Sequence, residues 1–209
     1  MGFSDLRTYS TAAGFKYASM PFPTIWGVQL TRFRAGVQVL PMPQWRLAKI
    51  DIGTDFILAY EGDYQWVLQA ITEDRNCGVS DSGMLVCDCT TNNAIDDYPT
   101  LYFTLGDIEL TLTPYQYFYQ VKCRQQNSLC LLLMYSSNSG WVLGSVFSRV
   151  YYSEFDPVKQ RIGFAPSLKS TLSAGPDSYL IWEVLSLTAL SLGLTYFVLR
   201  ACRLYHRNT

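Results

Sequence analysis

Short runs in which apolar and polar residues alternate recur through most of the chain, and this period constrains the fold more than any other feature. Residues 24–40, TIWGVQLTRFRAGVQVL, alternate on both sides of Gly36, as two strands joined by a turn would. Residues 100–112, TLYFTLGDIELTL, repeat the pattern on both sides of Gly106 and Asp107. β-Branched and aromatic residues, including 15 Tyr and 11 Phe, fill these runs. The sequence therefore predicts a mostly β fold.

One longer helix is expected among the strands. It runs from Gly62 or Asp63 to Ile71, with Asp63 as its N-cap. Its inner face is predicted to consist of Trp66, Val67, Ala70 and Ile71. Residues 72–83 are expected to form a loop, 84–89 a strand and 129–135 one apolar strand. Residues 140–156 predict a strand that leads into a helix or further strands, and 160–166 close the globular part.

Charge and cysteine content exclude some classes of function. The formal net charge is −1 and the first 170 residues contain no basic run, so a nucleic-acid-binding surface is not expected. The sole histidine is His206, and no CxxC pair is present, which argues against a zinc site. Disulfides formed in an oxidising compartment are the better interpretation of the six cysteines: Cys77, Cys87, Cys89, Cys123, Cys130 and Cys202.

Residues 179–199, YLIWEVLSLTALSLGLTYFVL, have the length of a transmembrane helix, and their single charge is Glu183. The basic residues that follow predict a cytoplasmic tail over 200–209 and a lumenal or extracellular side for residues 1–178. A buried C-terminal helix is the alternative. Residues 1–20 contain no apolar run typical of a signal peptide. Either the true beginning is missing, or the C-terminal anchor inserts the chain with its domain in the cytosol.

Four stretches carry a resemblance to a known family. Asp51, Gly53 and Thr54 form an Asp-Xaa-Gly-Thr turn after a short apolar strand. Leu112, Pro114 and Tyr117 follow a glycine turn, residues 142–144 read Val-Leu-Gly, and 162–165 read Ile-Gly-Phe-Ala. In this order they resemble the C-terminal lobe of a pepsin-like aspartic protease. The resemblance covers residues 26–166, after a lead-in over 1–25 and before a stalk over 167–178.

The resemblance implies a peptidase without metal or cofactor. Asp51 would be one of two catalytic aspartates, one from each lobe, which share a proton and hold a water. Gly53 would allow the turn, Thr54 would bond the outer carboxylate oxygen, and residues 142–144 would pack beneath the loop. The family's preference for acid suggests a secretory, endosomal or vacuolar location. The resemblance also pairs Cys130 with Cys87 or Cys89, and leaves Cys77 and Cys123 to pair with each other or with the remaining cysteine.

The sequence departs from the family pattern in ways that bear on activity. It holds one Asp-Xaa-Gly-Thr motif, and Ile52 stands where the family has Thr. Ser145 and Asp55 replace the family's usual Asp and Ser or Thr. Three hypotheses follow. The N-terminal lobe lies on an upstream segment or another chain; two copies of this chain bring two Asp51 residues together; or the lobe is catalytically inactive and binds a peptide or partner at the membrane.

Overall fold

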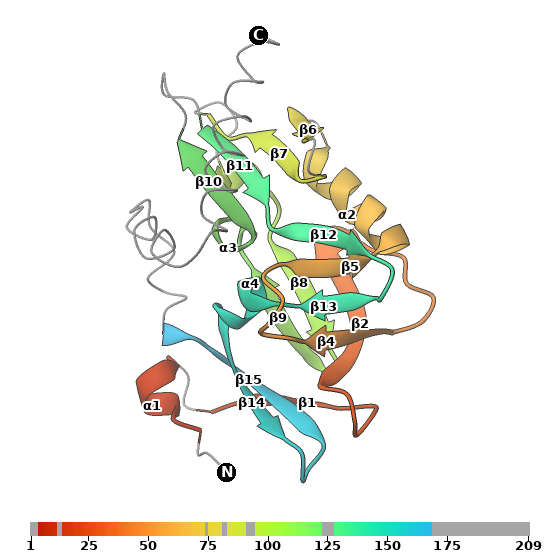
Figure 1. The fold of residues 1–209 in the computed structure, drawn as a ribbon, viewed down its shortest axis with the longest axis vertical. Helices are drawn as coiled ribbons and strands as arrows, with labels where there is room; N and C mark the ends of the chain where they lie inside the picture. The colour runs from red at the N-terminus through yellow and green to blue at the C-terminus, as the bar shows by residue number, and fades with distance from the viewer. Residues whose placement is uncertain are drawn as a thin grey trace.

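Three β-sheets make up most of the protein in the computed structural model, which describes residues 4–11, 14–73, 75–80, 83–90, 95–122 and 128–168. Figure 1 shows them one above another, with β10, β11, β7 and β6 at the top and β14, β15 and β1 at the bottom. The largest sheet lies between them. Helix α2 (Glu61–Thr72) packs along one side of the large sheet. The predicted mostly β fold is confirmed.

The large sheet has the strand order β12-β5-β13-β4-β2-β8-β9, and β3 pairs with β2. Its strands are β2 (Gly27–Ala35), β3 (Gln38–Val39), β4 (Arg46–Ile50), β5 (Ile57–Tyr60), β8 (Leu101–Leu105), β9 (Ile108–Leu112), β12 (Met134–Ser137) and β13 (Trp141–Leu143). Both predicted hairpins are present. Gly36 and Gly106 take φ values of 58° and 60° at their turns, a left-handed conformation that glycine adopts without steric cost.

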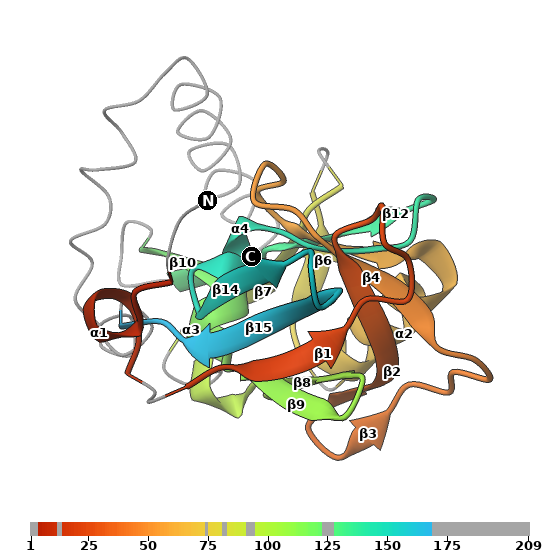
Figure 2. The same ribbon diagram turned by 90° about the horizontal axis from the view of Figure 1, so that it is seen from below.

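Two smaller sheets flank the large one. The four-stranded sheet has the order β10-β11-β7-β6, from β6 (Cys77–Val79), β7 (Leu85–Asp88), β10 (Phe118–Lys122) and β11 (Ser128–Leu132). The three-stranded sheet, in front in Figure 2, has the order β1-β15-β14, from β1 (Lys16–Ser19), β14 (Tyr151–Asp156) and β15 (Arg161–Pro166). The short helices are α1 (Leu6–Tyr9), η1 (Ile95–Asp97), α3 (Pro114–Tyr117) and α4 (Ser145–Ser148). Part of the segment predicted as a lead-in thus pairs with the C-terminal strand β15.

A chain of aromatic rings forms the core between the large sheet and the three-stranded sheet. The ring of Phe33 lies 5.0 Å from that of Phe103 and 5.2 Å from that of Trp141, measured between centroids. Phe147 continues the chain from Phe103 to Phe164 of β15. All five side chains are fully buried. Tilted and edge-to-face pairs of this kind add to the free energy gained by burying the rings.

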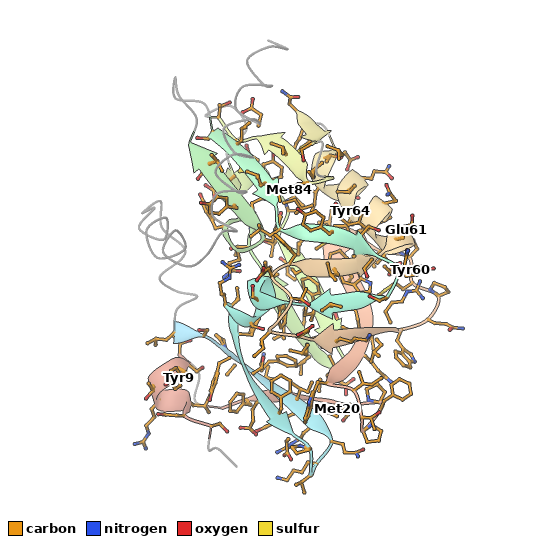
Figure 3. The ribbon with its side chains drawn as sticks, viewed as in Figure 1. Tyr9, Met20, Tyr60, Glu61, Tyr64 and Met84 are labelled. Carbon is orange, nitrogen blue, oxygen red and sulfur yellow. A yellow bond between two sulfur atoms is a disulfide. The ribbon has the colours of Figure 1, made fainter. Side chains whose placement is uncertain are left out.

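Helix α2 begins earlier than the sequence predicts, at Glu61, and Tyr60 is its N-cap. The predicted N-cap is therefore wrong, because Asp63 lies inside the helix and is buried. Of the predicted inner face, Val67, Ala70 and Ile71 are buried, whereas Trp66 is half-buried. Tyr64, labelled in Figure 3, completes the buried face, and its hydroxyl donates to the carbonyl of Met134 on β12 at 3.4 Å.

Two further predictions are corrected by long-range strand pairing. The apolar run 129–135 forms two strands in different sheets, because β11 ends at Leu132 and pairs with β7, whereas β12 begins at Met134 and pairs with β5. Leu133, between the two strands, donates its backbone N–H to the carbonyl of Tyr117. The predicted loop 72–83 contains β6, which pairs with β7. The predicted strand 84–89 is confirmed as β7, and of the helix or further strands predicted after the strand that begins near residue 140, both are present, as α4 and then β14.

The structure resolves the open question of disulfide pairing for four cysteines. Cys89 is bonded to Cys130, and Cys77 to Cys87. Both bonds lie in the four-stranded sheet, where Cys87 faces Cys77 on one side and Cys130 on the other. Cys123 and Cys202 lie outside the described residues. Two disulfides are typical of a protein that folds in the secretory pathway.

The predicted membrane segment, 179–199, also lies outside the described residues, as do most of the stalk and the whole basic tail. Within the part of the chain that is described, no helix is both long and apolar enough to cross a membrane.

Candidate active site

Asp51 lies directly after β4, at an exposed turn, and both oxygens of its carboxylate accept hydrogen bonds from the next residues. The backbone N–H of Gly53 donates to Oδ1 at 2.9 Å, and the hydroxyl of Thr54 donates to Oδ2 at 2.8 Å. The Thr54 N–H donates to the Asp51 carbonyl at 3.2 Å, which closes the turn. The three residues predicted as the catalytic motif therefore form one unit that holds the carboxylate in a fixed orientation.

Strand β13 positions this turn because it runs between β4 and β5. It is parallel to β4, with Trp141 opposite Ala48, and antiparallel to β5, with Leu143 opposite Ile57. The Asp51 N–H donates to the carbonyl of Leu143 at 3.2 Å. The turn between β4 and β5 is therefore fixed to the end of a third strand that is distant in sequence.

Gly144 allows the loop after β13 to lie against the Asp51 turn. A Cβ atom at this position would lie 2.2 Å from the carbonyl oxygen of Phe56 and 2.3 Å from that of Thr54. The next residue, Ser145, donates its N–H to the Thr54 carbonyl at 2.7 Å and its hydroxyl to the Asp55 carbonyl at 2.8 Å. Ser145, which departs from the family pattern, thus supports the turn. Of residues 142–144, which the resemblance places beneath the loop, Leu143 and Gly144 contact the turn through their backbone.

Ile52, the residue after Asp51, is an apolar residue at 72% relative exposure. It points away from the core while its neighbours bond the carboxylate. An isoleucine side chain can neither donate nor accept a hydrogen bond, so position 52 contributes only apolar contact to whatever faces it. Asp51 and Ile52 therefore present one charged and one apolar group side by side at the surface.

Asp63, which the sequence predicts as a helix cap, is a buried carboxylate with long-range partners. Asp63 Oδ2 accepts a hydrogen bond from Trp141 Nε1 at 2.8 Å and one from Arg46 Nε at 3.2 Å. These contacts connect α2 to both β13 and β4. The i and i+3 spacing of ordinary caps gives no signal for such a contact, because its partners are 17 and 78 residues away.

Pockets among the described residues include two that Asp51 does not line. The first, of about 280 Å³ and here named the Lys49 pocket, is lined by Arg46, Leu47, Lys49, Tyr60, Ser139, Gly140 and Trp141. The pocket extends along β4 from Arg46 to Lys49, and Lys49 is the lining residue nearest in sequence to Asp51, two residues before it. Two of the lining residues are cationic and none is acidic.

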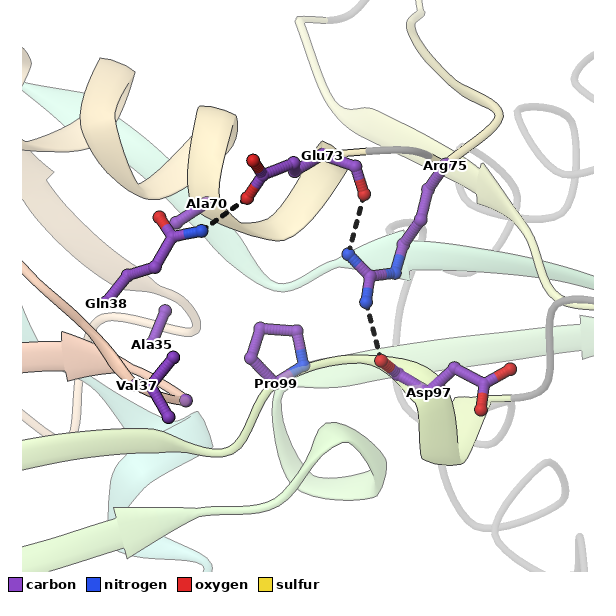
Figure 4. A pocket seen from close by; sticks show the side chains of 9 residues that line it. Ala35, Val37, Gln38, Ala70, Glu73, Arg75, Asp97 and Pro99 are labelled. Atoms are coloured by element: carbon purple, nitrogen blue, oxygen red, sulfur yellow. Dashed lines mark hydrogen bonds between the residues drawn. The ribbon is translucent and has the colours of Figure 1, made fainter.

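The second pocket, of about 410 Å³, lies between the β2–β3 turn and the C-terminal end of α2 (Figure 4). The Arg75 guanidinium at its edge donates to the carbonyls of Ile71, Glu73 and Asp97. Arg75 also lies over the ring of Tyr98, 4.9 Å from its centroid. The guanidinium thus satisfies the last carbonyls of α2 and fixes η1 to the helix, which is a structural role.

No cluster of three or more potential metal ligands occurs in the described part of the chain. Asp96 and Asp97 lie on η1, where the Asp96 carboxylate accepts a hydrogen bond from the Tyr115 hydroxyl.

The comparison with protein families matches residues 1–167 to the eukaryotic aspartyl proteases. The chain belongs to this family. The mostly β fold agrees with this assignment, and the match also includes the residues of β1. The assignment implies peptide substrates for the family as a class.

Individual relatives cover much of this chain but a minor part of their own length. Renin of Rattus norvegicus is 28% identical over 173 residues, which cover 79% of this chain and 40% of renin. Cathepsin E of Aquarana catesbeiana is 31% identical over 144 residues, 68% of this chain and 34% of the relative. Gastricsin of Cavia porcellus is 32% identical over 124 residues, 56% of this chain and 28% of the relative. The chain thus spans between about a quarter and two-fifths of these relatives.

Proposed function

We propose that the protein contributes Asp51 to an aspartic endopeptidase site, and that residues 26–166 form the C-terminal lobe of that enzyme. The observation that carries the proposal is the geometry of the turn. Both carboxylate oxygens are held by Gly53 and Thr54, yet the carboxylate remains exposed to a ligand. A carboxylate that was merely a surface charge would need neither the glycine turn nor the support of Gly144 and Ser145.

Peptide hydrolysis at such a site requires a second aspartate. Two carboxyl groups a few ångströms apart cannot both ionise, so one keeps its proton and polarises the scissile carbonyl. The other removes a proton from a bound water, which attacks the carbonyl carbon. In this scheme Asp51 supplies one carboxyl group, while Gly53 and Thr54 fix its orientation. The second comes from an opposing lobe on an upstream segment or another chain, or from a second copy of Asp51.

The same proposal includes the cellular setting. Residues 179–199 anchor the protein in a membrane, residues 167–178 connect the lobe to the anchor, and residues 200–209 lie in the cytoplasm. The disulfides favour a lumenal or extracellular lobe. Acidic secretory, endosomal or vacuolar compartments fit the requirement that one carboxyl group stay protonated.

A second candidate function is a membrane-bound module that binds a peptide or a partner protein without cleaving it. Ile52 favours it, because an apolar side chain at 72% exposure removes a hydroxyl from the face that an opposing lobe would contact. In that case the hydrogen-bonded turn at Asp51 would maintain the shape of the binding surface and would take no part in hydrolysis.

The native protein in its own membranes tests the two candidates. We expect cleavage of denatured protein substrate at acidic pH, and a loss of at least about 1,000-fold in Asp51→Asn, which keeps the size of the side chain but not its charge. Equal activity in Asp51→Asn would refute the assignment of this site. An inactive wild-type protein that still binds peptides would support the module. The apparent mass on a reducing gel, compared with 23.7 kDa for this chain, shows whether a second lobe is attached.

A further inference from the structure

The Lys49 pocket carries positive charge that the described residues leave uncompensated. The ammonium group of Lys49 makes no ion pair or hydrogen bond with any residue that the structure describes. Arg46 uses its Nε for Asp63, and neither of its terminal nitrogens has a partner within the described chain. Because the buried Asp63 pairs with Arg46, Lys49 is the one lining cation without a paired carboxylate among the described residues.

Strand alternation places this charge on the face of Asp51. Along β4, Ala48 and Ile50 are buried in the core, whereas Leu47 and Lys49 are half-buried and Asp51 is exposed. Side chains at i and i+2 of a strand lie on one face, about 6.5 Å apart along the chain. Lys49 therefore lies one dipeptide away from the carboxylate. An extended peptide that runs along β4 from Asp51 has the same rise per residue, so in that direction its side chain about two positions from the bond would reach the pocket.

The walls of the pocket can orient a planar anion. Arg46 Nε is held by its ion pair with the buried Asp63, and the guanidinium lies 5.6 Å from the ring centroid of Tyr60. The Ser139 hydroxyl, which shares a hydrogen bond with that of Ser137, completes the polar wall. Tyr60 and the first helical residue, Glu61, are labelled side by side in Figure 3, and Glu61 is not one of the lining residues. A carboxylate in the pocket thus meets the donors of Arg46 and Lys49 on β4 and the hydroxyl of Ser139 in the turn before β13.

From these observations we propose that the Lys49 pocket is a subsite for an acidic side chain of the bound peptide. The proposal rests on the proposed function, since it takes Asp51 as the point at which the peptide bond is held. Lys49 supplies the uncompensated charge, and Arg46 supplies paired donors that suit a carboxylate. The substrate class is a peptide with Glu or Asp about two residues from the bond that lies at Asp51.

A different role for Lys49 gives a different result. If the ammonium group served only to stabilise the ionised form of Asp51, its removal would slow the cleavage of every peptide. If it recognises an acidic side chain, its removal affects only peptides that carry one. The ratio of kcat/KM for two matched peptides separates these roles, because any effect on Asp51 cancels in the ratio.

The experiment uses the native full-length protein and pairs of peptides that differ only by Glu or Gln at two positions on either side of the cleaved bond. At about pH 5.5, where glutamate is ionised, we expect the wild type to prefer one Glu peptide about 10-fold in kcat/KM. Lys49→Met should remove most of this preference by slowing the Glu peptide, with a much smaller change for the Gln peptide. Lys159 is an exposed lysine in the turn between β14 and β15, and the control variant Lys159→Met should keep the Glu preference of the wild type.

Each outcome decides for or against the subsite. A wild type with no Glu preference, or a Lys49→Met variant that slows both peptides equally, overturns it. If the wild type cleaves neither peptide, binding of the same peptides is measured by calorimetry. Tighter binding of the Glu peptide that is lost in Lys49→Met would retain the subsite while the peptidase function fails. Equal binding of both peptides would refute the subsite as well.

Discussion

At the scale of single residues, the Asp51 turn depends on positions where a side chain has no space. Gly53 lies within the turn. A Cβ atom at this position would lie 3.3 Å from Asp51 Oδ1, a tight contact that a rotation of the carboxylate relieves. Gly144 differs, because its neighbours are two backbone carbonyls that cannot rotate away. The glycine beneath the turn is therefore more restrictive than the glycine within it.

We expect Gly144→Ala to lower the free energy of unfolding by about 3 kcal/mol or more, because the methyl group forces apart the chain segments that hold Asp51. The measurement is urea denaturation followed by tryptophan fluorescence. Gly62→Ala is the matched control. Gly62 lies in the first turn of α2, where a Cβ meets only the Tyr60 ring at 3.8 Å, so a change of no more than about 1 kcal/mol is expected. Equal effects of the two substitutions would contradict the steric account.

At the scale of secondary-structure elements, α2 is attached to the sheet by charge as well as by apolar contact. Asp63 is 5% exposed and is the acceptor for both Arg46 and Trp141, so one carboxylate joins the helix to β4 and β13. The same carboxylate keeps the Arg46 guanidinium at the wall of the Lys49 pocket. Helix packing and the proposed subsite therefore share this residue.

Asp63→Ala is expected to lower the free energy of unfolding by about 2–3 kcal/mol, because it leaves the indole N–H and the guanidinium without their acceptor. Arg46 is 31% exposed, so water replaces part of the lost contact. Asp63→Asn retains an oxygen acceptor for Trp141 and should cost about half as much. Chemical denaturation gives both values. Glu61→Ala, in the same first turn but exposed, should change stability by less than about 1 kcal/mol.

At the scale of the whole molecule, the two disulfides act through the unfolded chain. Cys89 and Cys130 are 41 residues apart, whereas Cys77 and Cys87 are 10 apart. A disulfide lowers the entropy of the unfolded chain, and this loss grows with the logarithm of the number of residues in the closed loop. Both bonds lie in the same small sheet, so differences in native packing between them are limited.

We expect the paired substitution of Cys89 and Cys130 by Ser to cost about 4 kcal/mol, and that of Cys77 and Cys87 about 3 kcal/mol. Thermal unfolding of the two double variants, compared with the wild type, gives the order. A larger loss for the Cys77–Cys87 variant would show that native contacts around β6, and not loop length, decide the stability.

Local sequence determined the two glycine hairpins and most other strands of the described chain, together with the residues of the Asp51 turn. A period of two assigns alternate residues to opposite faces whatever the partner strand, and glycine at a left-handed turn position identifies the hairpins at Gly36 and Gly106. The spacing of Asp51, Gly53 and Thr54 likewise contains its own hydrogen bonds. These features need no information beyond a few neighbouring residues.

Only the tertiary structure decided which segments meet. The apolar run 129–135 is divided between two sheets because different partner strands, β7 and β5, compete for its two halves. Asp63 is buried instead of capping a helix because β13 brings an indole N–H to it. The choice of Cys89 over Cys87 as the partner of Cys130, and the gathering of Arg46 and Lys49 at one pocket, depend equally on strand pairing. Contacts between distant residues are set by the packing of the whole chain, which no local pattern encodes.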